Sequence, residues 1–305
     1  MADTNFNPTD IGTRYMTIKL ILDTKLFPAG SNTKIITCNS DQNSLTAEAT
    51  ITKATGFSDA TAYVTIYGLL NEDINAFSRF NLSFASQIPE NWLEIYAGYS
   101  LTENGLPPLA YRGQVRLAAP NYNDPSRAFT IISQWGLVNQ NTVSPTTAPQ
   151  GSIDLNTLYS NIAGLFNPPL AYNGNNVTGV AINPNYSGSA SEQINAATRD
   201  YGFKAKQDNG RLLVAPVGQP FLKDIYKLDS KNGMLGYPIG EEFGYSVRVR
   251  YNPQIQFGQV INVTSQVLGA NSDWYINGMM TILQNRGQKW ETTFKLNKYL
   301  FLIEA

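Results

Sequence analysis

The segment YSVRVRYNPQIQFGQVINVTS, from Tyr245 to Ser265, alternates between apolar and polar residues on both sides of an Asn-Pro step. This alternation predicts two β-strands that each turn one face toward a core. In the first strand, Arg248 and Arg250 share one face because side chains alternate along a strand. The opposite face, which a core would claim, holds Tyr245, Val247, Val249 and Tyr251.

The two arginines need an explanation because the chain uses few charges. Charged residues make up 15% of the sequence, against roughly 25% in an average globular protein. Two like charges about 7 Å apart on one strand face repel mildly and need a carboxylate partner or solvent. Arginine is enriched at protein interfaces, so Arg248 and Arg250 are candidates for an intersubunit or channel-facing contact. An exposed face with intrachain Glu or Asp partners is the alternative, and the sequence leaves both open.

Composition excludes several kinds of chemistry. The 305-residue chain has a formal net charge of −1, which gives no global field for nucleic acid or an anionic membrane. It contains no histidine and a single cysteine, Cys38, so His-dependent catalysis, an intrachain disulfide and a Cys-based metal cage are all excluded. Cys38 ends an apolar run and is expected to be a buried structural thiol, with a reactive thiol as the alternative.

The sequence also lacks a pattern that would identify an enzyme. The most conspicuous acidic pair, Glu241-Glu242, would point to opposite faces of a strand, and a solvated loop is the favoured interpretation. We therefore expect no catalytic residue, no cofactor and no metal site. The polar first ten residues and the absence of a long apolar run predict a protein made in the cytoplasm, with no membrane segment.

The chain divides into three regions by pattern. Residues 1–149 read as a first β-barrel domain with one short helix over 71–80, which Asn71 could cap. Residues 150–220 read as an α/β insert, with a capping box formed by Ser189 and Glu192 and a hairpin turning at Asp208-Asn209-Gly210. Residues 221–305 read as a second β-barrel domain. The predicted fold is mainly β, with two similar barrels flanking a small α/β module.

The last hairpin carries two tryptophans. Trp290 alternates with Thr292 and Phe294 on one face of the second arm, and Trp274 begins the first arm. We expect Trp274 and Trp290 to lie in the core or at a subunit interface rather than in a ligand site.

Several segments together resemble one known family. The segments AYVTIYGLLNEDINAFSRF, LAYRGQVRLAAPNYNDPSRAFTIISQ, GSASEQINAATRDYGFKAKQDNGRLLVAPVGQP and MLGYPIGEEFGYSVRVRYNPQIQFGQVINVTS resemble, in this order, baseplate hub proteins of contractile-tailed bacteriophages. The resemblance covers about residues 60–305. It depends on the order of these segments and on their general sequence pattern rather than on a catalytic motif. No fused lysozyme segment, which some hubs carry, is visible.

The resemblance implies a structural, non-enzymatic virion protein of the tail baseplate, made in the host cytoplasm. It implies a homotrimeric ring that serves as a symmetry adaptor, joining the six-fold tail tube protein to the three-fold central spike protein. Baseplate wedge proteins and the tape measure protein are further partners it suggests, and the genome would pass the ring channel without sequence-specific binding. Two alternatives stay open: a carbohydrate- or receptor-binding β-protein of a tail, and a carboxylate-dependent glycosidase.

Overall fold

A computed structural model describes residues 12–21, 33–40, 44–54, 60–78, 91–121, 128–136 and 142–298 of the chain. Among its described residues, the first region contains one helix, α1 (Asn71–Phe77), and seven strands. These strands are β1 (Tyr15–Ile21), β2 (Thr33–Thr37), β3 (Thr46–Ala54), β4 (Thr61–Tyr67), β5 (Trp92–Gly98), β6 (Leu109–Asn121) and β7 (Ala128–Gln134). The last region contains a short 3-10 helix, η2 (Leu268–Ala270), together with β13 (Ile225–Leu228), β14 (Ile239–Glu241), β15 (Gly244–Arg250), β16 (Val260–Val263), β17 (Ser272–Gln284) and β18 (Trp290–Asn297).

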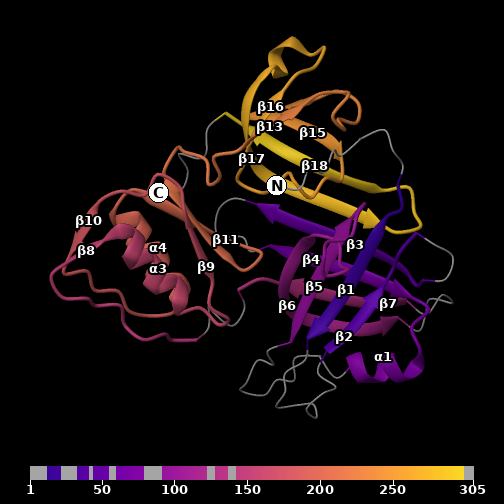
Figure 1. Cartoon of the computed structure of the whole chain (residues 1–305), viewed down its shortest axis with the longest axis horizontal. Helices are drawn as coiled ribbons and strands as arrows, with labels where there is room; N and C mark the ends of the chain where they lie inside the picture. The colour runs from indigo at the N-terminus through magenta and orange to yellow at the C-terminus, as the bar shows by residue number, and fades with distance from the viewer. Residues whose placement is uncertain are drawn as a thin grey trace.

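These thirteen strands belong to one hydrogen-bonded sheet. Its order is β14-β15-β18-β17-β3-β4-β7-β6-β5-β1-β2, and β16 adds to β17 and carries β13 at its other edge. Strand β17 connects the two β-rich regions: its first part pairs with β16, and its second part, from Gly278 to Gln284, pairs with β3. Thirteen residues at about 3.3 Å each make this strand long enough to belong to both regions. Figure 1 shows β17 and β18 running from the last region toward β3.

The fold is mainly β, as predicted, but the two β-rich regions are not separate sheets. The strand order is open at β14 and at β2 among the described residues, and this pairing closes neither region into a barrel. The sequence pattern shows where apolar and polar residues alternate, and so where strands form. Which strands pair depends on contacts between residues that are far apart in the sequence. The division into two barrels therefore stays a prediction.

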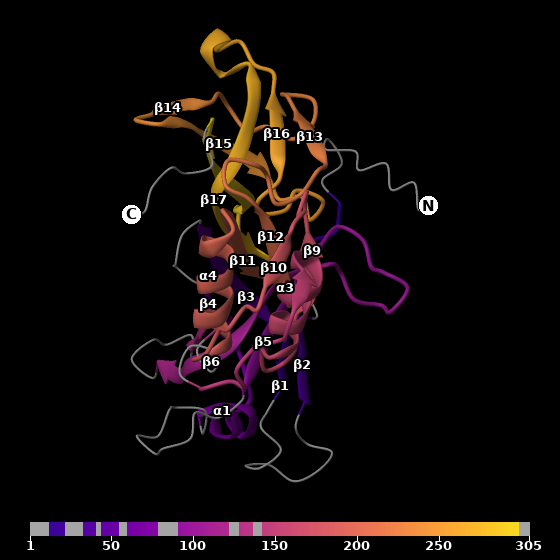
Figure 2. The ribbon, with the colours of Figure 1, turned by 90° about the vertical axis from the view of Figure 1, so that its left-hand side faces the viewer.

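The α/β module lies to one side of this sheet (Figures 1 and 2). Its elements are β8 (Ser152–Asp154), α3 (Leu155–Gly164), β9 (Ala171–Gly174), β10 (Val180–Ile182), α4 (Ala190–Asp200), β11 (Phe203–Asp208) and β12 (Arg211–Pro216). They form two small sheets, β10-β8 and β11-β12-β9, with the two helices packed against them. The helix and hairpin predicted between residues 189 and 216 are confirmed.

Local signals explain the ends of the helices. The Ser189 hydroxyl accepts a hydrogen bond from the Glu192 backbone N–H, and the Glu192 carboxylate accepts one from the Ser189 N–H at 2.7 Å, which confirms the capping box. The prediction for α1 was wrong in one detail. Asn71 is the first helical residue, Leu70 occupies the N-cap position, and no side chain caps it. Ile74 and Phe77 nevertheless form its buried face, as the spacing predicts.

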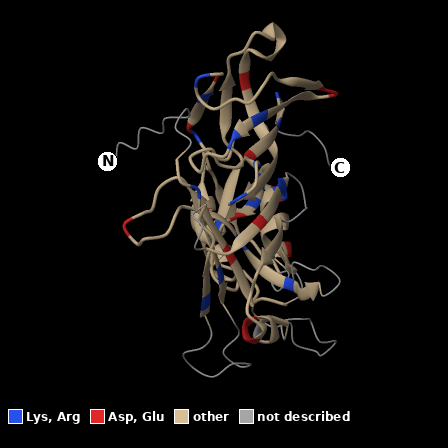
Figure 3. Cartoon of the chain, turned by 90° about the vertical axis from the view of Figure 1, so that its right-hand side faces the viewer, with Lys and Arg blue, Asp and Glu red and all other residues tan. Residues whose placement is uncertain are grey.

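Charged side chains are sparse over the described surface (Figure 3). No helix among the described residues combines the length and the apolar composition needed to cross a membrane.

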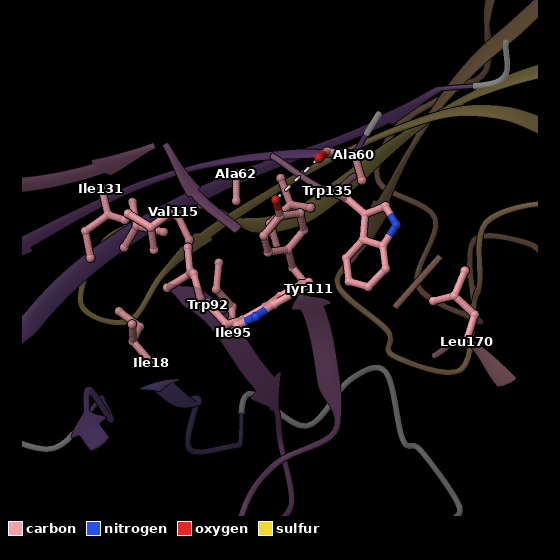
Figure 4. Packing of buried hydrophobic residues seen from close by; sticks show 14 of the residues in the cluster. Ile18, Ala60, Ala62, Trp92, Ile95, Tyr111, Val115, Ile131, Trp135 and Leu170 are labelled. Carbon is pink, nitrogen blue, oxygen red and sulfur yellow. Dashed lines mark hydrogen bonds between the residues drawn. The ribbon is translucent and has the colours of Figure 1, made fainter. Parts of the chain in front are cut away.

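The hydrophobic core joins the first β region to the α/β module. One buried cluster contains residues of both, including Ile18, Trp92 and Leu170. Trp92 and Trp135 pack with ring centroids 5.3 Å apart, and the Trp135 indole N–H donates to Gln207 of β11. The Tyr111 hydroxyl, in the same cluster, donates to the Ala60 carbonyl (Figure 4). A second cluster fills the last region, so it has a core of its own although it shares the sheet.

Candidate assembly surface

Strand β15 presents the two predicted arginines as the alternation requires. Val247 and Val249 are 1% exposed and point into the second cluster. The Arg248 side chain is 56% exposed, and its Nη2 atom lies 3.1 Å from Oε2 of Glu291 on the neighbouring strand β18. The structure therefore shows an intrachain carboxylate partner for Arg248. A contact from either arginine to another chain stays a prediction.

Arg250 lies at the end of β15 beside residues from distant parts of the chain. It lines a cavity of about 180 Å³ together with Arg14, Tyr99, Leu235, Gln288, Trp290 and Glu291; this set is called the arginine pocket below. The Arg14 guanidinium lies 5.7 Å from the centre of the Trp290 ring and donates to the carbonyls of Gln284 and Gly287. No pattern in the sequence indicated a role for Arg14, because its partners Gln284, Gly287 and Trp290 lie at the other end of the chain.

Burial shifts the pKa of one hydroxyl group in this pocket. Burial raises the pKa of the Tyr99 hydroxyl to about 12, although Arg250 and Arg14 partly oppose the shift. The phenol is therefore a neutral group that can donate a hydrogen bond at physiological pH. Two guanidinium groups, a phenol and an indole make the lining rich in donors, which suits a carboxylate.

Both predicted tryptophans are buried within the chain. Trp274 is 5% exposed, donates its indole N–H to the Ala270 carbonyl at 2.7 Å, and packs edge-on against Tyr245. Trp290 is 3% exposed and packs against Tyr99 and Tyr251. The core interpretation agrees with these contacts, whereas an additional role at a subunit interface stays a prediction.

The acidic pair Glu241-Glu242 lies at the tip of the hairpin formed by β14 and β15. Both residues are exposed, and neither forms an ion pair within the part of the chain that the structure describes. The neighbouring side chains Ile239 and Phe243 are 64% and 68% exposed. Figure 2 shows this hairpin projecting away from the body of the last region, with acidic residues at its end in Figure 3.

A second cavity, of about 230 Å³, lies where all three regions meet. Lys53 of β3 and Asp208 of β11 line it and form an ion pair at 2.6 Å, with side chains 5% and 4% exposed. Arg211 Nη2 contacts Asp208 at 3.3 Å and also donates to Gln256 of the last region at 3.0 Å. These contacts fix the α/β module against both β regions. The sequence predicted none of them.

The described residues offer no cluster typical of metal binding. No group of three or more His, Cys, Asp or Glu side chains in the described ranges could hold a metal ion. Glu241 and Glu242 lie on an exposed hairpin rather than in a cleft. What the surface offers is a pocket of donors, a projecting acidic tip and apolar side chains open to solvent, which are features of protein assembly.

Comparison with known proteins agrees with an assembly role. The family model described as baseplate hub gp41 matches residues 33–295, so this chain belongs to the baseplate hub gp41 family. The family consists of structural proteins of phage tails. This confirms the resemblance to baseplate hub proteins and a location in the virion tail. A search of curated proteins gives no match.

Two solved structures share the fold at low sequence identity. The tail protein from Neisseria meningitidis MC58 aligns with a TM-score of 0.56 and 10% identity, over 92% of this chain and 96% of that one. The 43 kDa tail protein of prophage MuSo2 from Shewanella oneidensis aligns with a TM-score of 0.56 and 12% identity, over 92% of this chain and 95% of that one. The likeness therefore extends over both β-rich regions and the module between them.

Proposed function

We propose that this chain is the ring-forming hub subunit that joins the six-fold tail tube to the three-fold central spike of a contractile tail. The observation that carries the proposal is the extent of the family match, residues 33–295, which spans both β-rich regions and the α/β module. In a homotrimer, two β-rich regions per chain present six related units to the tube, while the trimer itself matches the spike. Each region acts in this proposal as one barrel-like unit.

The continuous sheet supports this role mechanically. Because β17 pairs with both β16 and β3, the two β-rich regions of a chain are held in one fixed relation by backbone hydrogen bonds. The buried Lys53–Asp208 pair holds the module against them. A rigid subunit suits an adaptor that must keep two symmetries in register. The proposed role needs no catalysis; the proposed partners are the tube and spike proteins, with wedge and tape measure proteins as further neighbours.

The test is the mass and shape of the purified chain. We expect light scattering to give three times the chain mass of 33.6 kDa, and negative-stain images to show a ring with a central channel. Co-purification with the tail tube protein and with the spike protein encoded by the same phage is the second expected result. A monomer at micromolar concentration that binds neither protein would refute the adaptor proposal. Retention of such a monomer on a glycan array would favour a receptor-binding protein instead.

A further inference from the structure

The arginine pocket has a buried donor, the Trp290 indole N–H, that the described chain leaves without an acceptor. Trp290 is 3% exposed, and its indole nitrogen has no hydrogen-bond partner within the described ranges. A buried donor without a partner costs about 1–3 kcal/mol, so such a group usually has one in the working state. With Arg14 and Arg250 in the same lining, the missing partner is expected to be an anionic oxygen.

The pocket has one internal carboxylate, but it is already engaged. Glu291 lies at the pocket edge, and its carboxylate accepts a hydrogen bond from the outward-facing Arg248. The ring of Tyr99 and the side chain of Leu235 give the pocket an apolar side beside its donors. Its occupant is thus expected to combine a carboxylate with an apolar side chain.

The tip of the β14–β15 hairpin has this combination. Glu241 and Glu242 are flanked by the exposed Ile239 and Phe243. Apolar side chains on an exposed hairpin at a sheet edge indicate a surface that another protein covers. A short edge strand that projects in this way is also easily inserted into a neighbour (Figure 2).

The tip is unable to reach the pocket of its own chain. Strand β15 runs from Gly244, beside the tip, to Arg250, in the pocket. Seven strand residues at about 3.3 Å each separate the two ends by roughly 20 Å. Contact between tip and pocket therefore requires two copies.

We propose that the Glu241-Glu242 tip of one copy inserts into the arginine pocket of the next. The carboxylates accept hydrogen bonds from Arg14, Arg250 and the Trp290 indole, and Phe243 packs against the aromatic wall. Because the two surfaces differ, the contact is head-to-tail, which closes a ring when the rotation between copies allows it. The inference deepens the proposed hub function by naming the surfaces that form its ring.

Charge reversal tests the contact. The tip variant carries Glu241→Arg and Glu242→Arg, and the pocket variant carries Arg250→Glu. The control variant carries Glu72→Arg and Glu103→Arg, which are exposed positions away from the tip and the pocket. Sedimentation velocity over a concentration series measures association, and circular dichroism verifies folding. We expect the tip and pocket variants to associate at least about 30-fold more weakly than wild type, and the control to match wild type.

A combined variant distinguishes a specific contact from general damage. The chain that carries Glu242→Arg with Arg250→Glu restores an opposite-charge pair between copies, and we expect it to recover most of the association. Trp290→Phe, which keeps an aromatic ring but removes the indole N–H together with part of the ring system, should weaken association while circular dichroism still shows a folded chain. The pocket assignment would be overturned by one set of results: the tip variant loses association, Arg250→Glu does not, and the combined variant recovers none of it.

The inference and the proposed function fail in different ways. A wild-type trimer that the tip, pocket and tryptophan variants leave unchanged would overturn the tip-to-pocket contact alone. A wild-type chain that stays monomeric and binds neither tube nor spike protein would overturn both.

Discussion

Lys53 Nζ lies 2.6 Å from Oδ1 of Asp208, and both side chains are almost completely buried although 155 residues separate them. Lys53 belongs to the first β region, and Asp208 is the last residue of strand β11 in the module hairpin. Arg211 extends the contact to Gln256 in the last region. The first β region, the α/β module and the last region thus meet at one charged cluster, in a protein that has few charged residues.

Breaking this pair is expected to destabilise the chain strongly. Asp208→Asn leaves the Lys53 ammonium buried without its counter-charge, which should lower the free energy of unfolding by about 3–5 kcal/mol. Replacing both residues, with Lys53→Met and Asp208→Leu, should cost much less because no buried charge remains. Urea unfolding followed by tryptophan fluorescence measures both. Lys34→Ala breaks the exposed Lys34–Asp73 pair as a control and should cost under about 1 kcal/mol. Equal losses in the single and double Lys53 and Asp208 variants would contradict this account.

Asn285 is expected to fix the β17–β18 turn against the first β region. Its side chain is 1% exposed, donates to the carbonyls of Asn39 and Leu45, and accepts from the Ala47 N–H. Asn285→Ala leaves these backbone groups unpaired and should lower the free energy of unfolding by on the order of 3 kcal/mol.

The matched control for that change is Asn262→Ala. Asn262 makes an exposed hydrogen bond to Asp273, so its loss should cost under about 1 kcal/mol. Comparable denaturation midpoints for the Asn285 and Asn262 variants would show that the turn is not held by Asn285.

Cys38 should report global unfolding. It is fully buried, and burial raises the pKa of its thiol to about 12 even though Arg286 opposes the shift. The native thiol is therefore both shielded and protonated, and Ellman's reagent at pH 8 should react only as fast as the chain unfolds. A chain with Cys38→Ala and Ser230→Cys, which moves the thiol to an exposed position, should react at once. Rapid labelling of native wild-type protein would disprove the buried, unreactive thiol.

Lys204 should make stability depend on pH. Burial lowers the pKa of its ammonium to about 8, and its Nζ lies 4.6 Å from the centre of the Phe221 ring. Since the unfolded lysine titrates near 10.4, the unfolded state binds more protons between about pH 8 and pH 10.4. The burial penalty is therefore complete below about pH 8 and disappears as pH rises through that window.

Lys204→Met removes this penalty. We expect the variant to melt a few degrees above wild type at pH 7 and the difference to vanish near pH 10.4. Lys227→Met, at an exposed position, is the control and should show no such trend. A difference between Lys204→Met and wild type that is constant from pH 7 to pH 10.5 would contradict the assigned cause.

The sequence by itself determined the local structure. The capping box at Ser189 and the Asn209-Gly210 turn are signals within a few residues, and both are present as predicted. The alternation around Val247 and Val249 correctly placed those valines inside and Arg248 outside. Such features depend on side-chain periodicity and backbone preference, which are readable in a short window.

Only the tertiary structure decided how the three regions combine. The pairing of β17 with β3 merges the two β regions into one sheet, and Arg14 meets Arg250 in one pocket. Strand pairing and buried ion pairs depend on complementarity between surfaces far apart in sequence, and every amphipathic strand offers many equivalent partners. Lys53 and Asp208 each look like ordinary surface residues in their own segments, because their burial exists only after the chain has folded.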